Sequence, residues 1–101
     1  MGRPMADFIF LMHDDAPGGA AHDWDPYLTR LRETEVFQGG SAIGAGCCER
    51  KSGQPPAPTA HITGFLRVAA DDLAHARRLL AGNPVFEAGG TVEIRELPRG
   101  S

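Results

Sequence analysis

The feature that most constrains this fold is the order in which two hydrophobic periodicities follow one another along the chain. Short apolar runs typical of strands fall at residues 7–13, 41–51, 61–70 and 91–97. Stripes with a period of about 3.6 residues, typical of helices, follow Asp25 and Asp71. This order matches the ferredoxin-like unit. We therefore predict an α+β fold, ferredoxin-like βαββαβ, with a four-stranded antiparallel sheet and two helices on one face.

Turn and cap residues predict where the helices begin and end. Asp25 as N-cap and Pro26 at the first helical position are a typical helix start. Asp71 is the predicted cap of the second helix, which Gly82 ends and Pro84 cannot continue. We expect the buried stripe of that helix to consist of Leu73, Ala76, Leu79 and Leu80.

Length and composition place the chain among single-domain globular proteins. Its 101 residues, 42% hydrophobic and 23% charged, provide one modest core. We expect one domain over residues 1–101, with its core at 5–97 and a cloning-derived tail at 98–101. The net charge of −3 argues against nucleic-acid binding. No run of about 18 apolar residues predicts a membrane span.

The amino terminus and the cysteines indicate a cytoplasmic protein. The start MGRPMADF lacks the basic and apolar regions of a secretory signal. Cys47 and Cys48 are adjacent, so on a strand their side chains point to opposite faces and do not form a disulfide readily. We expect both to be free thiols in a reducing compartment.

Alternation along the strands predicts a sheet face that the helices do not cover. It places Phe65 and Arg67 on one face of the third strand, and Glu93 and Arg95 on one face of the fourth. A bare face with large apolar side chains calls for a partner, so we expect a homodimer through this face. Its charges would then pair with one another or line a polar cavity.

The predicted topology also indicates a ligand pocket. We expect the first and third strands to lie side by side in the sheet and to run parallel, which places His13 and Arg67 at one end and His61 at the other, near Asp7. The candidate ligand-binding residues at the first end are Trp24, Tyr27, Ser41, Arg67, Asn83 and Phe86. Arg67 suits a carboxylate or phenolate on a ligand, but pairing with Glu93 is an equal alternative.

Histidine and aspartate are concentrated in the first connection, and three interpretations stay open. The cluster consists of His13, Asp14, Asp15, His22, Asp23 and Asp25. Aspartates beside Gly and Pro serve turns and caps. His13 is alternatively a small-molecule contact and general base, our candidate catalytic residue. A metal is the third interpretation, but no recognised ligand spacing is present, so we predict neither a metal nor a cofactor.

Five runs, in this order and spacing, are similar to the YCII-related family of the dimeric α/β-barrel superfamily. They are FIFLMHDD, WDPYLTRL, FQGGSAIG, ITGFLRVAA and NPVFEAGGTVEIREL. The DGPF tetrapeptide of one large branch is missing, and HITGFL stands in its place. The resemblance covers residues 5–97. It implies a dimeric α/β barrel with a cleft, in a family of mostly unassigned activity that includes lyases and isomerases acting on small ring compounds.

The resemblance also shows what this chain lacks. Many relatives carry a His in the first helix and an Asp in an Asp-Pro pair, proposed as an acid/base dyad. Those positions match Trp24 and Asn83, neither of which exchanges protons near neutral pH. Two hypotheses therefore remain: a dimeric small-molecule-binding protein, and a cofactor-free lyase or isomerase with His13 as base. Whether the protein is an enzyme is left open.

Overall fold

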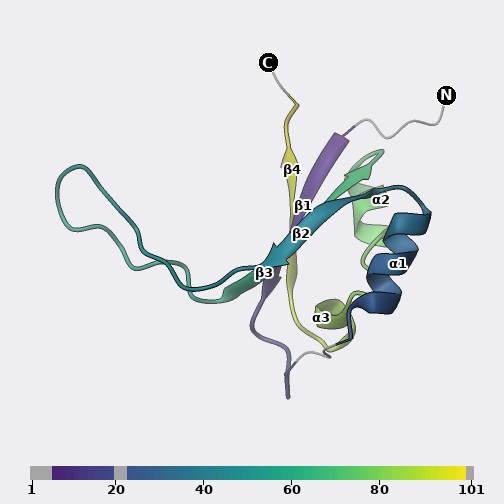
Figure 1. Cartoon of the computed structure of the whole chain (residues 1–101), viewed down its shortest axis with the longest axis horizontal. Helices are drawn as coiled ribbons and strands as arrows, with labels where there is room; N and C mark the ends of the chain where they lie inside the picture. Colours follow the sequence, from purple (N-terminus) through teal and green to yellow (C-terminus); the bar gives the residue numbers. More distant parts are fainter. Residues whose placement is uncertain (1–5, 20–22, 100–101) are drawn as a thin grey trace.

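The computed structural model describes residues 6–19 and 23–99, and it folds into a four-stranded antiparallel sheet with three helices (Figure 1). The elements are β1 (Ala6–His13), α1 (Asp25–Glu33), β2 (Phe37–Ala42), β3 (Ile62–Ala70), α2 (Leu73–Arg78), α3 (Pro84–Glu87) and β4 (Val92–Leu97). The strand order is β2-β3-β1-β4. The predicted α+β class and the antiparallel sheet are confirmed, and the arrangement is compatible with a ferredoxin-like fold.

The predicted parallel pairing of the two middle strands is wrong. β1 and β3 pair antiparallel, with His13 opposite Ile62 and Asp7 opposite Ala69. β3 returns directly from β2 in an antiparallel pair, and the α1 crossover leaves β1 and β2 pointing the same way, so β3 between them must oppose both. His61 therefore lies at the same end as His13, and Arg67 lies opposite Ile9.

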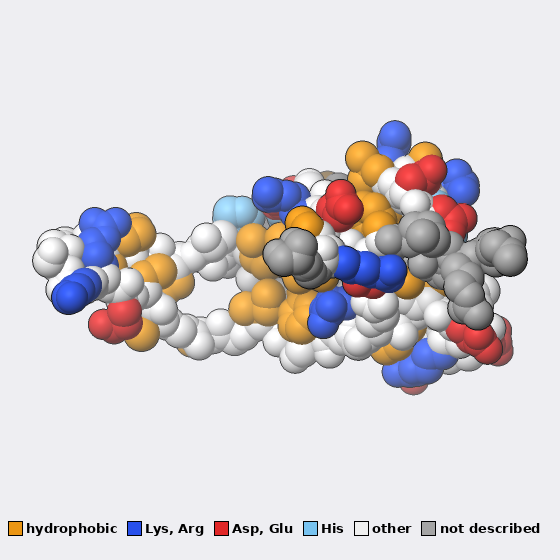
Figure 2. All heavy atoms as spheres, turned by 90° about the horizontal axis from the view of Figure 1, so that it is seen from above, with side chains coloured by type: hydrophobic (Ala, Val, Ile, Leu, Met, Phe, Trp, Pro, Cys, Tyr) orange, Lys and Arg blue, Asp and Glu red, His pale blue; other side chains and the backbone are white. Residues whose placement is uncertain are grey.

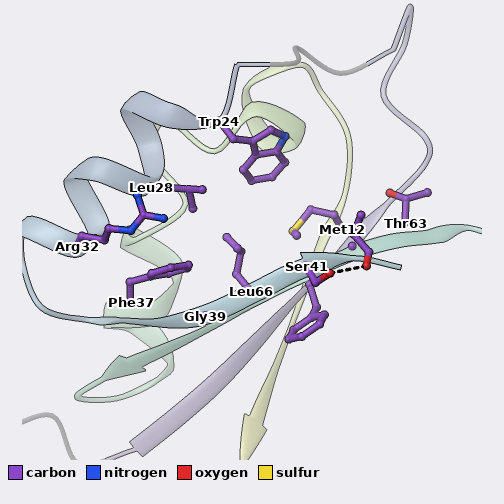
Figure 3. Close-up of a pocket in the computed structure, with 13 residues that line it drawn as sticks. Met12, Trp24, Leu28, Arg32, Phe37, Gly39, Ser41, Thr63 and Leu66 are labelled. Carbon is purple, nitrogen blue, oxygen red and sulfur yellow. Dashed lines mark hydrogen bonds between the residues drawn. The ribbon is translucent and has the colours of Figure 1, made fainter. Parts of the chain in front are cut away.

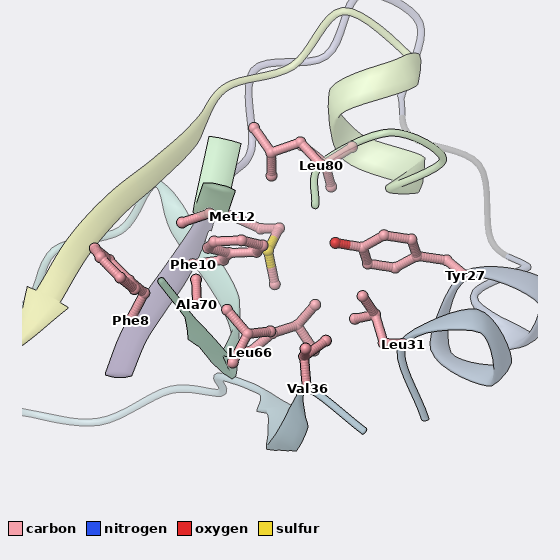
Figure 4. Close-up of a cluster of buried hydrophobic side chains, with 12 residues drawn as sticks. Phe8, Phe10, Met12, Tyr27, Leu31, Val36, Leu66, Ala70 and Leu80 are labelled. Carbon is pink, nitrogen blue, oxygen red and sulfur yellow. The ribbon is translucent and has the colours of Figure 1, made fainter. Parts of the chain in front are cut away.

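The core lies between the sheet and the helices (Figure 4). Every second residue of β1 and β3 points into it, and α1, α3 and the chain after α2 close it. Its members include Phe8, Phe10, Met12, Tyr27, Leu31, Leu66, Val68, Leu80 and Val85. Full burial of one such large apolar side chain contributes about 1.5–3 kcal/mol. This single layer of side chains fixes the position of α1 over the sheet.

The predicted helix starts are each displaced by one residue. α1 begins at Asp25, so Trp24 occupies the N-cap position that we predicted for Asp25. In α2 the cap is Asp72 rather than Asp71, and its side chain accepts a hydrogen bond from the backbone N–H of His75 at 2.8 Å. α2 is only six residues long, and Leu73, predicted to be buried, is 53% exposed.

The segment predicted as a turn after Gly82 contains a third helix, α3. Asn83 caps it: its Oδ1 accepts hydrogen bonds from the backbone N–H groups of Val85 at 3.0 Å and Phe86 at 3.1 Å. Pro84 is the first helical residue, where its missing N–H costs nothing. Gly82 has a φ of +88°, the left-handed conformation that favours glycine, but α2 already ends at Arg78, so the prediction that Gly82 ends this helix is wrong.

The second strand differs most from the prediction, because β2 ends at Ala42 and the chain then leaves the sheet. Residues 43–61, which we call the arm, contain no helix or strand and project far from the body (Figure 1). The Cα radius of gyration is 15.2 Å, against about 13 Å for a compact chain of this length. Glycines early in the arm and prolines late in it do not favour continued pairing.

Candidate functional site

A pocket of about 430 Å³ lies between α1 and the neighbouring strands β2 and β3 (Figure 3). Its walls are mostly apolar, and its floor is formed by the ends of β2 and β3. The side chains that define its walls are Met12, Trp24, Leu28, Arg32, Phe37 and Leu66. Concave, largely apolar spaces with a few polar groups are typical ligand sites.

The spacing of residues along α1 explains how one helix serves both the core and the pocket. Trp24, Leu28 and Arg32 recur every four residues and point toward the pocket (Figure 3). Tyr27 and Leu31, also four residues apart, form the adjacent row and are 2% exposed. Because the second row is anchored in the core, the first row is held over the sheet at a fixed height.

Glycine makes part of the pocket floor, and two of these glycines have close neighbours. A Cβ added at Gly40 would meet the carbonyl oxygen of Phe65 and would come within 2.6 Å of Leu66 Cδ2. At Gly64 it would meet the Ser41 carbonyl oxygen at 3.3 Å. These two glycines add no side chain to the floor, and the side chains of Leu66 and Met12 lie beside them.

Among the residues that the structure describes, Arg32 is the only cationic side chain in the pocket lining. Its guanidinium carbon lies 5.2 Å from the centre of the Phe37 ring, a cation–π contact that holds it beside the pocket. Within residues 6–19 and 23–99 it forms no salt bridge. Across the floor, the Ser41 hydroxyl donates to the carbonyl of Ala42 at 2.8 Å. The pocket therefore combines one available positive charge with apolar walls.

Of the predicted site residues, Trp24 and Ser41 line the pocket. Phe86 is 46% exposed on α3 and does not line it. His13 and Arg67 are absent from the lining too. The predicted grouping of Trp24, His13 and Arg67 at one end is wrong, because it depended on the parallel pairing of β1 and β3.

Tyr27 and Asn83, both predicted to bind ligand, lie outside the pocket lining and form hydrogen bonds within the fold. The Tyr27 hydroxyl donates to the Leu79 carbonyl at 2.7 Å, and burial raises the pKa of this hydroxyl. Asn83 is fully buried as the α3 cap. Its Nδ2 has no hydrogen-bond partner of normal geometry among the described residues, although it lies near enough to the Tyr27 hydroxyl to oppose that rise.

His13 lies on the sheet face that the helices do not cover, which we call the open face, and it pairs with Glu93. Its Nε2 lies 3.0 Å from Glu93 Oε1, and Arg95 donates to Glu93 Oε2 at 3.2 Å. The hydrogen bond with His13 and, to a lesser extent, the one from Arg95 lower the pKa of Glu93. The His61 ring packs edge-on against His13, with centres 4.8 Å apart. The predicted alternative of an Arg67–Glu93 pair is therefore wrong.

Where the structure gives an acidic residue of the first connection a hydrogen-bond partner, the carboxylate accepts from a backbone N–H group or a threonine hydroxyl. Asp15 accepts hydrogen bonds from Thr91 N at 2.7 Å and from Thr91 Oγ1 at 2.6 Å, which lower its pKa. Asp23 accepts from the Asp25 backbone at 3.2 Å. His22 lies outside the described residues. Within residues 6–19 and 23–99, no three His, Cys, Asp or Glu side chains are placed to hold a metal ion.

Sequence reasoning missed Leu28, Arg32 and Phe37 as pocket residues. The four-residue spacing of Trp24, Leu28 and Arg32 was the signal that could have grouped them on one helix face. We predicted Arg67, on a strand, as the cationic ligand contact instead. Phe37 carried no such signal, because it lay between the predicted elements.

Comparison with known proteins does not identify a family for this chain. No protein-family model matches it, and a search of curated proteins finds no similar sequence. In the part of the chain that the structure describes, no helix has the length and apolar character to cross a membrane. The YCII-related resemblance therefore stays a prediction.

Proposed function

We propose that this protein binds a small, flat, mainly apolar molecule that carries an anionic group. The observation that carries the proposal is Arg32, a cation without a salt bridge among the described residues, at the rim of an apolar pocket. An apolar pocket excludes water from a ring stacked on its floor, and a guanidinium binds a carboxylate with a charge-assisted hydrogen bond. Trp24 and Phe37, two aromatic side chains of the lining, support a flat ring as the ligand, because aromatic rings stack on one another.

We further propose that the protein is a homodimer of the YCII-related type, joined through the open face. The alternation of β1 and β3 places Ile9, Leu11 and Phe65 on this face, where the structure leaves them half-buried. They lie outside the core cluster. Covering them with the same face of a second copy removes apolar area from water at about 25 cal/mol per Å². Free Cys47 and Cys48 are consistent with the cytoplasm.

The only tryptophan of the chain, Trp24, lines the pocket and so provides the assay. Titration with a series of aromatic carboxylates should quench or shift its fluorescence, and the neutral amide of each should bind more weakly. Arg32→Gln should weaken carboxylate binding about tenfold, because a hydrogen bond to a charged group contributes about 1.5 kcal/mol. Arg77→Gln, an exposed helix arginine far from the pocket lining, is the matched control.

Three outcomes would each refute a different part of this proposal. Equal binding of acids and amides by the native protein would refute the role of Arg32. An unchanged tryptophan signal with every aromatic compound tested would refute the pocket as a ligand site. Sedimentation of the native protein as a monomer at micromolar concentration would refute the dimer independently.

A second candidate, a cofactor-free lyase or isomerase, is favoured by the His13–Glu93 hydrogen bond. An ionised carboxylate only accepts hydrogen bonds, so Nε2 of His13 carries the proton and Nδ1 is left as a base. Substrate would then bind on the open face, away from the pocket. If proton exchange on a ring substrate is found, His13→Gln and Glu93→Gln should both slow it, whereas equal loss in His61→Gln would show that packing alone matters.

A further inference from the structure

The arm makes few contacts with its own domain. Of its residues, all except Cys48 and Pro55 are exposed. Its side-chain hydrogen bonds among the described residues stay within it: Arg50 donates to the Gln54 carbonyl at 3.0 Å, and the Cys47 thiol lies 3.6 Å from Glu49. Loops this long without secondary structure are uncommon in compact domains unless they have a function. The arm is therefore not explained by the fold of a single chain.

Both ends of the arm are anchored, and this sets its direction away from the pocket. The Ile43 N–H donates to the Thr63 carbonyl at 2.9 Å, and the Asp14 N–H donates to the His61 carbonyl at 2.7 Å. The arm thus continues outward from the β2–β3 pair (Figure 1). Its return limb contains Pro55, Pro56 and Pro58, whose fixed φ favours an extended chain. No arm residue lines the pocket, so the arm is no lid for it.

The base of the arm adjoins the open face. His61, its last residue, packs against the ring of His13 with centres 4.8 Å apart, and His13 belongs to the open face through its bond to Glu93. The surface that the proposed dimer buries is thus continuous with the base of the arm at His61. A second copy placed on the open face would lie beside an arm that already projects past the edge of the sheet.

The charge of the arm is opposite to that of the body. The arm carries Arg50, Lys51 and Glu49, for a formal charge of +1. The whole chain has a charge of −3, so the remaining residues carry −4. Figure 2 shows basic side chains gathered at the far end of the arm. A basic tip on an acidic protein is complementary to another copy of the same protein.

From these observations we infer that the arm docks on the body of a second copy of this chain, with Arg50 and Lys51 against the partner's body, whose net charge is −4. The inference rests on the proposed homodimer and extends it. The open face supplies apolar contacts between the two subunits. The arm adds charged contacts that fix the orientation of one subunit relative to the other. Arg50 and Lys51 would then be contacts between subunits, and salt would weaken the dimer by screening them.

The test compares two pairs of adjacent, exposed arginines or lysines. The double variant Arg50→Glu/Lys51→Glu reverses the charge of these two side chains at the tip of the arm. The double variant Arg77→Glu/Arg78→Glu makes the same change of charge on α2 and is the matched control. Dimer dissociation constants are measured by sedimentation velocity over a dilution series, at about 50 and 500 mM salt. The arm variant should dissociate about tenfold more readily than the native protein at low salt, with a smaller difference at high salt.

A shortened arm, with residues 46–59 replaced by a Gly-Ser-Gly turn, gives a second measurement. It should keep the circular dichroism spectrum of the native protein while the dimer weakens at least tenfold. If the native protein is a dimer and neither arm variant changes it, the arm inference is overturned and the open-face dimer stands. If the α2 control weakens the dimer equally, charge at the tip is not the cause and the inference is overturned. A native monomer would overturn both.

Discussion

Replacing Asn83 by alanine tests whether this residue is a buried helix cap rather than part of a ligand site. The side chain is fully buried, and its Oδ1 accepts two backbone hydrogen bonds, from Val85 and Phe86. Alanine removes both acceptor bonds at once. It leaves the Val85 N–H without a partner in a part of the core where Val85 itself is 5% exposed.

The expected loss of stability follows from these contacts. Removing an N-cap costs about 1 kcal/mol on average, and stranding a buried donor costs about 1–3 kcal/mol more. Part of this is offset, because the variant also removes Nδ2, which has no partner among the described residues. The sum is about 2–3 kcal/mol. With a urea m-value of about 1.2 kcal/mol/M for a domain of this size, the unfolding midpoint should fall by about 2 M.

The matched control is Asp72→Ala at the cap of α2. Asp72 is exposed and accepts a single backbone hydrogen bond, from His75 at 2.8 Å. Because water can replace the lost carboxylate as the acceptor, the variant should lose only about 0.5–1 kcal/mol of stability. Urea unfolding followed by circular dichroism compares the two variants. A loss for Asn83→Ala no larger than that for Asp72→Ala would refute the reasoning, since burial would then add nothing to the cap.

Two further predictions concern the pocket floor and the acid side of the pH range. Gly40→Val should destabilise the fold by about 1–3 kcal/mol, because its Cβ would collide with Phe65 and Leu66. It should also abolish ligand-induced changes in tryptophan fluorescence. A free energy of unfolding equal to that of the native protein would contradict this prediction. Asp15 has a lowered pKa through Thr91, so its contribution is present at neutral pH and is lost as the pH falls below about 4. The difference in melting temperature between the native protein and Asp15→Asn should therefore narrow in that range, and a constant difference down to about pH 2 would exclude this source of stability.

The sequence by itself determined the order of the four strands and of the helices α1 and α2. An apolar run at residues 7–13 and alternation in residues 61–70 and 91–97 located three of the four strands to within a residue. A period of about 3.6 residues predicted the apolar stripe of α1. Alternation in the fourth strand placed Glu93 and Arg95 on the face away from the core. These features depend on neighbours a few positions away. The second strand was misplaced, since glycine-rich sequence carries little periodicity.

Only the tertiary structure decided which distant residues meet. The direction of β3 relative to β1 determined that His13 lies beside His61, and the register of β4 placed Glu93 against His13, 80 residues away in the chain. Tyr27 and Trp24 are neighbours on one helix, yet one lies in the core and the other lines the pocket. Their roles depend on how α1 is rotated over the sheet. Strand direction, register and helix rotation are set by packing across the whole domain, so no local window of residues contains them.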